Sequence, residues 1–337
     1  MPGISDEQLA GYLSRASLPG FSPTARIQRL AGDGDIVRWR LHAGAAPVLV
    51  KLYPPESGRC RRELAGLRLG GTLGLAPTLL LADERGAALG GPVVVLEEPA
   101  GTPLGEHRLA PEDVHGWLFL LLTLHHLPAG SLSLSSSMSA DIAVWWQRNQ
   151  PIWEACRAAY AGHANSALLD ALTRLHAIVG ARVEARRELW QNIVRRPCHG
   201  NPVPAHVVRT SDRLLLIEWD GFGLGDPAME VGRAAALAVL SGELDTTQYV
   251  RFVADYLAGM RDAAEATLEE RLRVFASVLP LGFCFTVLHL LAESQLSPTE
   301  REHYVAQVGR ALTWIQDTLG VRVGDAEELL AGLRRGE

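Results

Sequence analysis

Short apolar or alternating runs, separated by glycine and proline, fill much of the first hundred residues. Runs of this kind predict β-strands, and there are five of them: Arg26–Ala31, Ile36–His42, Pro47–Tyr53, Thr78–Asp83 and Pro92–Glu97. Between the third and the fourth, Gly58–Gly70 carries leucines at helical spacing. Ser5–Ser14 begins with the capping-box pattern Ser5-x-x-Gln8, which predicts a further short helix before the sheet.

From Pro111 onward the pattern becomes helical. The predicted helices are long and rich in leucine and alanine: Pro111–Leu127, Ser166–Gln191, Thr246–Met260, Leu268–Ala292, Thr299–Leu319 and Asp325–Arg335. The serine-rich stretch Gly130–Ser139 predicts a mobile surface loop. Pro197–Asp226 interrupts the helical pattern and contains one predicted strand, Leu214–Trp219.

The change of pattern near residue 100 predicts an α+β chain with two lobes. We expect residues 1–99 to form a small lobe with an antiparallel sheet and residues 100–337 to form a larger, mostly helical lobe. Val274–Ala292 has no charged residue and is long enough to span a bilayer. No second such stretch accompanies it, and it contains Pro280, so we expect a buried core helix rather than a membrane span.

Composition narrows the classes of protein further. Apolar residues make up 47% and charged residues 21% of the chain, as in folded globular proteins. The net charge of −6 argues against a nucleic-acid binder, which would carry a basic excess. The first ten residues carry acids where a signal peptide needs positive charge, and the four cysteines form no C-x-x-C pair. These features predict a cytoplasmic protein with reduced thiols.

The basic residues are distributed unusually. Of 32 lysines and arginines, 31 are arginine and one is lysine, Lys51, in the apolar run Val48–Leu52. Because an ammonium is a compact charge on a slim stem, arginine cannot replace it everywhere. We therefore expect Lys51 to have a role specific to lysine, such as phosphate binding, with Glu63 of the following helix as its ion partner. The alternative is a surface lysine that extends into solvent.

Several catalytic motifs are absent from the sequence, namely the P-loop, the G-x-S-x-G elbow and H-E-x-x-H. What remains is a set of groups in a fixed order. Gly32-Asp33-Gly34 lies at a predicted strand turn, which by itself is typical of an ordinary hairpin. Much later come Cys198-His199-Gly200-Asn201-Pro202-Val203-Pro204-Ala205-His206, then Leu216-Ile217-Glu218-Trp219-Asp220, and then Gly225-Asp226-Pro227-Ala228.

In the order and spacing of these groups, the sequence resembles the aminoglycoside phosphotransferase and choline kinase family. That family is the small-molecule branch of the protein-kinase-like fold, and the resemblance runs from about Leu30 to about Leu240. It implies a bilobal kinase-like fold that binds ATP with Mg²⁺, or alternatively Mn²⁺. It further implies a nucleotide site made by the residues Gly32, Gly34, Lys51, Glu63 and Glu97, the last in the inter-lobe hinge.

The resemblance also implies a catalytic loop and a metal site, where this chain departs from the family pattern. Asn201 replaces the aspartate that takes the acceptor proton, and an amide cannot accept a proton. His206 replaces a metal-binding asparagine, although Mg²⁺ prefers oxygen ligands. Glu218 replaces the metal-binding aspartate, and its extra methylene displaces the carboxylate. Pro99 has no N–H to offer an adenine ring at the hinge.

Alternatives stay open for several of these residues. If Ile217–Asp220 is a strand, Glu218 and Asp220 face the same side and could hold one cation together; Asp220 could equally be a solvated residue or a cap. His199, given the family's pattern, is expected to hold the catalytic loop rather than to touch substrate. Asp226 is expected to accept structural hydrogen bonds. A transition-metal site of His199, His206 and Glu218 is a further alternative.

Two functions follow from this interpretation. The first is an ATP-dependent phosphotransferase that acts on a hydroxyl of a small molecule, with Asn201 and His199 in the catalytic loop and Glu218, His206 and Asp220 at the metal. The second is a pseudokinase that binds a nucleotide or metabolite without turnover. Nucleotidyl transfer would use the same cleft, but no residue favours it. The partners expected are a small-molecule acceptor and neither nucleic acid nor membrane; the acceptor and the oligomeric state cannot be derived from the sequence.

Overall fold

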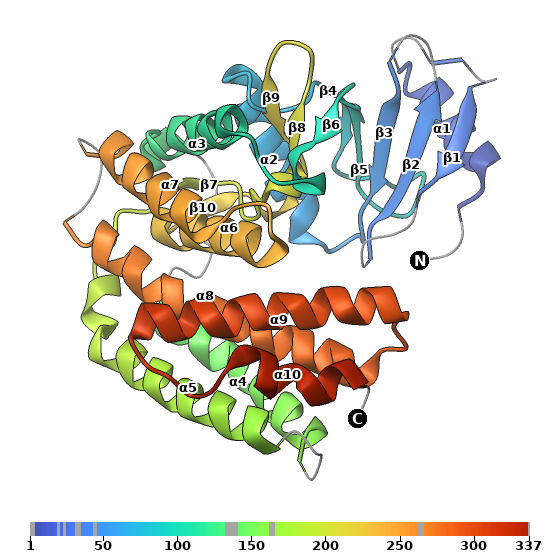
Figure 1. Ribbon diagram of the computed structural model, residues 1–337. Coiled ribbons are helices and arrows are strands. Elements are labelled where there is room, and N and C mark those ends of the chain that lie inside the picture. Colours follow the sequence, from blue (N-terminus) through green and yellow to red (C-terminus); the bar gives the residue numbers. More distant parts are fainter. Residues whose placement is uncertain are drawn as a thin grey trace. The chain divides into compact units, whose positions relative to one another are not determined.

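The computed structural model describes residues 4–18, 21–22, 25–30, 35–42, 46–131, 141–161, 166–261 and 266–335 (Figure 1). The chain divides into two compact units. The first comprises residues 1–106, 110–136 and 197–224, and the second comprises residues 107–109, 137–196 and 225–337. The first unit thus combines the N-terminal sheet with the segment that carries the His-Gly-Asn motif. The predicted lobe boundary after residue 99 stays a prediction.

A five-stranded antiparallel sheet forms the centre of the first unit. Its order is β1-β2-β3-β5-β4, from β1 (Arg26–Arg29), β2 (Val37–His42), β3 (Val48–Leu52), β4 (Leu79–Asp83) and β5 (Val93–Glu97). The five predicted strands are therefore confirmed. The alternation of β2 and β3 gives the sheet two different faces: Trp39 pairs with Val50, and the next pair along the strands is Arg38 with Lys51.

Two helices accompany the sheet. α1 (Asp6–Arg15) begins at the predicted Ser5 capping box, and its residues Leu9, Tyr12 and Leu13 pack in one apolar cluster with Trp39 and Val50. α2 (Gly58–Thr72) begins at Ser57, whose side chain accepts from the backbone N–H of Arg59. The remaining elements of the first unit are α3 (Pro111–His125), β6 (Thr102–Pro103), β7 (Arg196–Cys198), β8 (Val207–Arg209), β9 (Leu214–Leu216) and β10 (Gly223–Gly225), with short 3-10 helices at 104–106, 129–131, 204–206 and 219–221.

The second unit is helical. Its elements are α4 (Ile142–Ala159), α5 (Ser166–Ala185), a 3-10 helix at 187–190, α6 (Pro227–Ser241), α7 (Thr246–Gly259), α8 (Leu268–Glu293), α9 (Pro298–Leu319) and α10 (Ala326–Arg335). Within the described residues, α8 is the one helix long and apolar enough to cross a membrane, and 78% of its most apolar window is buried. The expectation of a core helix is confirmed.

Three sequence predictions need correction. α4 and α6 were not predicted. α4 contains Pro151, and α6 begins at Pro227, inside the motif Gly225-Asp226-Pro227-Ala228. The predicted helix Ser166–Gln191 ends at Ala185. The predicted strand Leu214–Trp219 ends at Leu216, because Glu218 adopts a left-handed backbone conformation with φ 63° and ψ 57°. Most of the predicted loop Gly130–Ser139 lies outside the described residues.

Candidate functional site

Lys51 lies on β3 and is fully inside the first unit. Its side chain is 1% exposed, and its Nζ donates to Glu63 at 2.6 Å and to Glu218 at 3.0 Å. Burial on its own would lower the pKa of Lys51, but the two carboxylates outweigh that effect and raise it. The lysine is therefore charged and held between two anions, and the expected contact with Glu63 is present. The role of this pair in nucleotide binding stays a prediction.

Glu63 is positioned by the way in which α2 docks. Its carboxylate is buried beside Lys51. Burial raises the pKa of Glu63 despite the nearby ammonium. One turn further along α2, Gly66 leaves no room for a side chain: a Cβ there would lie 2.6 Å from Trp219. Gly70 is closely packed against the same indole. The glycines thus bring α2 against the 3-10 turn at 219–221.

The His-Gly-Asn segment follows β7 and packs against the same turn. Gly200 has φ +95°, and a Cβ there would lie 2.3 Å from the carbonyl oxygen of Gly221. His199 is buried, and its ring meets Trp219 edge-on at 4.6 Å between centroids. The Nδ1 of His199 accepts from the backbone N–H of Asn201 at 3.3 Å. His199 therefore holds the loop by its contacts, while a direct part in catalysis stays a prediction.

Asn201 and His206 contact one another across the loop. The Nδ1 of His206 lies 2.8 Å from the carbonyl oxygen of Asn201 and 3.3 Å from the side-chain amide nitrogen of the same residue. A carbonyl oxygen only accepts, so the shorter contact has the Nδ1 of His206 as donor, and the amide nitrogen, itself a donor, then only lies beside it. The indole of Trp117, on α3, donates to the backbone carbonyl of Pro202 at 2.8 Å, and this bond holds the loop against α3.

Glu218 accepts hydrogen bonds from two cations. Its Oε2 accepts from Lys51 and from Arg38 Nη2, each at 3.0 Å. Burial would raise the pKa of Glu218, but Lys51, Arg38 and the nearby His206 together lower it. Next to Glu218, the backbone N–H of Ile217 donates to the carbonyl of His206 at 2.9 Å, so Lys51, Glu218, His206 and Asn201 lie in one region of the first unit.

Asp220 faces different partners. Arg59 donates from Nε to its carboxylate at 2.7 Å, and the Nε of Arg62 donates to its backbone carbonyl at 2.9 Å. Residues 219–221 form a 3-10 helix, so the predicted strand Ile217–Asp220, and the shared face derived from it, are wrong. Glu218 contacts Lys51 and Arg38, whereas the carboxylate of Asp220 contacts Arg59.

The carboxylates of this region do not offer an open oxygen cage. One oxygen of Glu218 already takes an ammonium and a guanidinium, and Asp220 is paired with Arg59. Mg²⁺ needs near-ideal octahedral oxygen geometry at short distances. As arranged, the set fits basic side chains and does not fit Mg²⁺ or Mn²⁺. Among the described residues, His199, His206 and Glu218 also do not gather as a shared metal site.

Gly32, Gly34 and Glu97 are the other residues predicted to bind the nucleotide. Gly32 and Gly34 lie outside the described residues. Glu97 is exposed at the end of β5, and its backbone N–H donates to Thr78 at 2.9 Å. The neighbouring Glu98 binds Arg40 through two hydrogen bonds of 2.6 Å.

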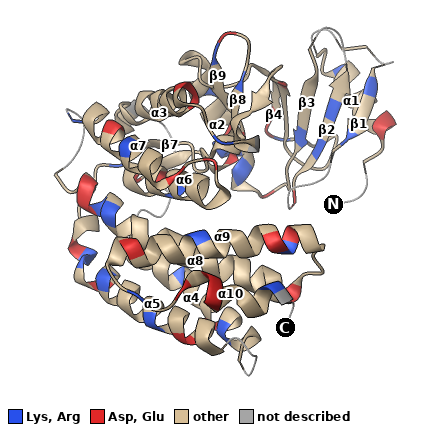
Figure 2. Cartoon of the chain, viewed as in Figure 1, with Lys and Arg blue, Asp and Glu red and all other residues tan. Residues whose placement is uncertain are grey.

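Sequence reasoning missed the arginines of the region: Arg38, Arg40, Arg59 and Arg62. A signal for two of them existed in β2, where Arg38 and Arg40 alternate with apolar residues and so share a face of the sheet. Figure 2 shows blue, basic positions on β2. Nothing in the sequence placed Arg59 and Arg62 beside Asp220.

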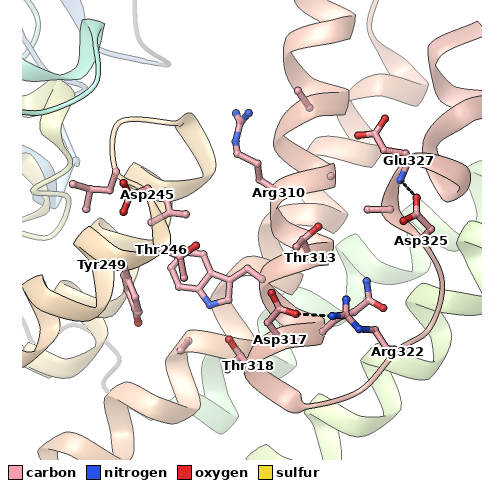
Figure 3. A pocket seen from close by; sticks show the side chains of 18 of the residues that line it. Asp245, Thr246, Tyr249, Arg310, Thr313, Asp317, Thr318, Arg322, Asp325 and Glu327 are labelled. Carbon is pink, nitrogen blue, oxygen red and sulfur yellow. Dashed lines mark hydrogen bonds and ion pairs between the residues drawn. The ribbon is translucent and has the colours of Figure 1, made fainter.

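A separate cavity of about 930 Å³ lies within the second unit (Figure 3). Arg310, Asp317, Arg322 and Tyr249 are among its lining residues, and an ion pair of 3.3 Å joins Arg322 to Asp317. None of the predicted site residues lines it.

Comparison with known proteins decides the family. The model of the phosphotransferase enzyme family matches residues 26–267, which is more than half of the chain. The chain belongs to the phosphotransferase enzyme family. The resemblance inferred from the motifs is therefore confirmed.

The solved structures similar to this phosphotransferase-family chain have the same fold. The choline kinase LicA from Streptococcus pneumoniae has a TM-score of 0.57 at 15% identity, over 92% of this chain and 98% of that one. A spectinomycin phosphotransferase in complex with ADP and spectinomycin has a TM-score of 0.59 at 12% identity, over 99% and 100% of the two chains. The α+β, protein-kinase-like fold is thus confirmed.

Matches to curated sequences are short. Protein LicA from Haemophilus influenzae is 38% identical over 56 residues, which are 17% of this chain and 16% of that protein. A second LicA protein of Haemophilus influenzae is 36% identical over 56 residues, which are 21% of its length. The chain therefore spans about a fifth or less of the curated relatives it matches.

Proposed function

We propose that this chain transfers the γ-phosphoryl group of ATP to a hydroxyl of a small molecule. The observation that carries the proposal is the buried Lys51–Glu63 pair together with Glu218, which contacts Lys51 and directly follows Ile217, whose backbone N–H donates to the carbonyl of His206. A buried ammonium with a fixed acidic partner is suited to orient phosphates, and phosphoryl transfer depends mainly on positioning and electrostatics. Membership of the phosphotransferase family supports the same reaction class.

In this reaction the acceptor oxygen forms a bond to the γ-phosphorus and the bond to the β–γ bridging oxygen breaks, which releases ADP. Lys51 binds the phosphates and Glu63 orients Lys51. The amide of Asn201 orients the acceptor hydroxyl, but it takes no proton. The hydroxyl proton therefore passes to the transferred phosphoryl group or to water. Mg²⁺ is implied by the resemblance, but no step here depends on it.

The acceptor is proposed to be a small amino alcohol. Two proteins of similar fold are named for choline and for spectinomycin, and both compounds carry a hydroxyl and a positively charged nitrogen, a quaternary ammonium in choline and protonated amines in spectinomycin. The proposed partners are thus ATP and a small molecule. Cytoplasmic location stays a prediction, as do the roles of Glu97 and Asp220.

The test measures ADP release with ATP and a panel of amino alcohols, together with the melting temperature with and without ATP. We expect ATP to raise the melting temperature and at least one acceptor to release ADP. A shift with ATP but no ADP release across the panel would favour the pseudokinase, an alternative that the comparisons do not support. No shift with any nucleotide would overturn the proposal.

A double variant sharpens this test. Asn201→Asp with His206→Asn supplies a proton acceptor and removes the imidazole, so turnover should rise, by ~10² or more if general-base catalysis is recovered. The control is Asn192→Asp, an exposed asparagine with the positive φ that aspartate also tolerates. Equal turnover in the double variant and the wild type would contradict the assignment of Asn201.

A further inference from the structure

Two cations of the first unit share one carboxylate oxygen. The Nη2 of Arg38 and the Nζ of Lys51 each lie 3.0 Å from Oε2 of Glu218. Since both contact the same atom, twice that distance, about 6 Å, is the furthest apart that they can be. Their residues are direct neighbours across the β2–β3 pair, so the two side chains leave the same face of the sheet.

The two carboxylates around Lys51 differ in their access to solvent. Glu63 is 1% exposed in its side chain, whereas Glu218 is 17% and Arg38 is 16% exposed. An incoming anion can therefore replace Glu218 as the partner of the two cations, but it cannot replace Glu63. Glu218 is the counter-ion on the open side.

Asp220 does not compete for these two cations. Its carboxylate is paired with Arg59 at the start of α2, which also contacts Asp35 at 3.0 Å. An anion that takes the place of Glu218 would therefore meet two cations, Lys51 and Arg38, at one point. The pair of cations is thus suited to a polyanion, and a guanidinium can bind phosphate oxygens through two parallel hydrogen bonds.

We propose that Arg38 is a phosphate-binding residue, and that Arg38 and Lys51 together, called the Arg38–Lys51 clamp, bind the nucleotide polyphosphate without a divalent cation. Glu218 is then the resident counter-ion that the phosphates displace, rather than a metal ligand. Fixed positive groups can stabilise phosphoryl charge electrostatically, as a metal ion would. The proposal rests on the proposed function, because it assumes that the site binds a nucleotide.

Calorimetric titration of ATP in excess EDTA and again in excess Mg²⁺ tests the clamp. We expect the wild type to bind ATP in EDTA within about tenfold of its affinity in Mg²⁺. Arg38→Ala should weaken binding in EDTA at least tenfold. The matched control is Arg68→Ala, which removes an arginine of the same unit that is 58% exposed and 3.4 Å from Glu84. It should change the affinity less than twofold.

A second variant distinguishes the two roles of Glu218. Glu218→Gln removes the counter-ion but keeps the shape, so it should strengthen ATP binding in EDTA severalfold. If Glu218 were a metal ligand, the same variant would leave binding in EDTA unchanged and weaken binding in Mg²⁺. Circular dichroism and the melting temperature of each variant show that it is folded.

The outcomes separate the two proposals. If the wild type binds ATP only with Mg²⁺, or if Arg38→Ala binds like Arg68→Ala, the clamp is wrong and the proposed phosphotransferase remains. If the wild type binds ATP under neither condition, the proposed function fails as well. Weaker binding by Glu218→Gln in EDTA would also overturn the clamp.

Discussion

Lys51 shows at the scale of one residue why an ammonium differs from a guanidinium. Its slim side chain is buried, and its Nζ lies between the carboxylates of Glu63 and Glu218, at 2.6 and 3.0 Å. A guanidinium is planar and wider, and it would need five donors satisfied in a space that supplies two acceptors. In a chain with 31 arginines, the retention of lysine here follows from that space.

Lys51→Arg is therefore expected to weaken ATP binding at least tenfold although the charge is kept. Calorimetric titration measures the affinity, with Arg68→Lys as the control because its side chain is exposed and its exchange should have little effect. An ATP affinity equal to that of the wild type would refute this explanation of the lysine.

At the scale of elements, the site depends on how α2 meets the turn at 219–221. Gly66 and Gly70 lie on the contact side, where Trp219 fills the space that side chains would take. Gly71 of the same helix faces open space, since a Cβ added there would meet no atom within 4 Å. The helix that carries Glu63 is thus held at a fixed distance from the residues that follow β9.

Gly66→Ala should push α2 from Trp219, because the new Cβ would lie 2.6 Å from the indole. We expect a loss of about 1–3 kcal/mol in the free energy of unfolding and weaker ATP binding through displaced Glu63. Gly71→Ala is the matched control and should be neutral or stabilising by up to about 1 kcal/mol. Equal denaturation midpoints for the two variants would contradict the packing argument.

A second element depends on a buried ion pair within the helical unit. Asp226 begins α6: its Oδ1 accepts from the N–H of Ala228 at 2.9 Å. The same carboxylate accepts from Trp190 and from Arg271, each at 3.2 Å, with both charged side chains fully buried. The expectation that Asp226 accepts structural hydrogen bonds is confirmed.

Asp226→Ala should cost about 3–5 kcal/mol in urea unfolding, because it leaves the charge of Arg271 buried without this partner. Asp245→Ala removes another aspartate that begins a helix, α7, but one whose side chain is 43% exposed, so it should cost only about 1 kcal/mol. Adding Arg271→Met to Asp226→Ala should recover part of the loss. Similar costs for the two single variants would show that burial of the pair is unimportant.

The sequence predicted elements better than contacts. The five strands and α2 were predictable because alternation and helical spacing are local signals. The strand expected at Ile217–Asp220 was wrong because Glu218 has a left-handed backbone, which the local pattern of apolar residues does not indicate. Arg38 and Arg59 were missed for a related reason: their partners lie 180 and 161 residues away, and no local pattern contains such a pairing.

At the scale of the whole molecule, stability depends on pH through buried acids. Glu243, between α6 and α7, is buried, and burial raises its pKa to about 7. In the unfolded chain its pKa is about 4.3. From about pH 4.3 to 7 the unfolded chain releases this proton while the folded chain keeps it, so the stability contributed by the neutral acid is lost as pH rises.

Glu243→Gln should abolish this part of the pH dependence. We expect the variant to be more stable than the wild type at pH 8, by about 1–3 kcal/mol, and to match it near pH 4. Urea unfolding across that range measures the difference, with Glu270→Gln as an exposed control. A constant difference between wild type and variant at all pH values would contradict the raised pKa.

The solitary lysine also makes the chain chemically simple. An amine-acylating reagent would find one ε-amino group in 337 residues, and that group is enclosed by β3, Glu63 and Glu218. Apart from the terminal amine, each acyl group added would therefore record one opening of the first unit. The rate of labelling would measure how often the first unit opens, and a ligand bound at Lys51 would slow it.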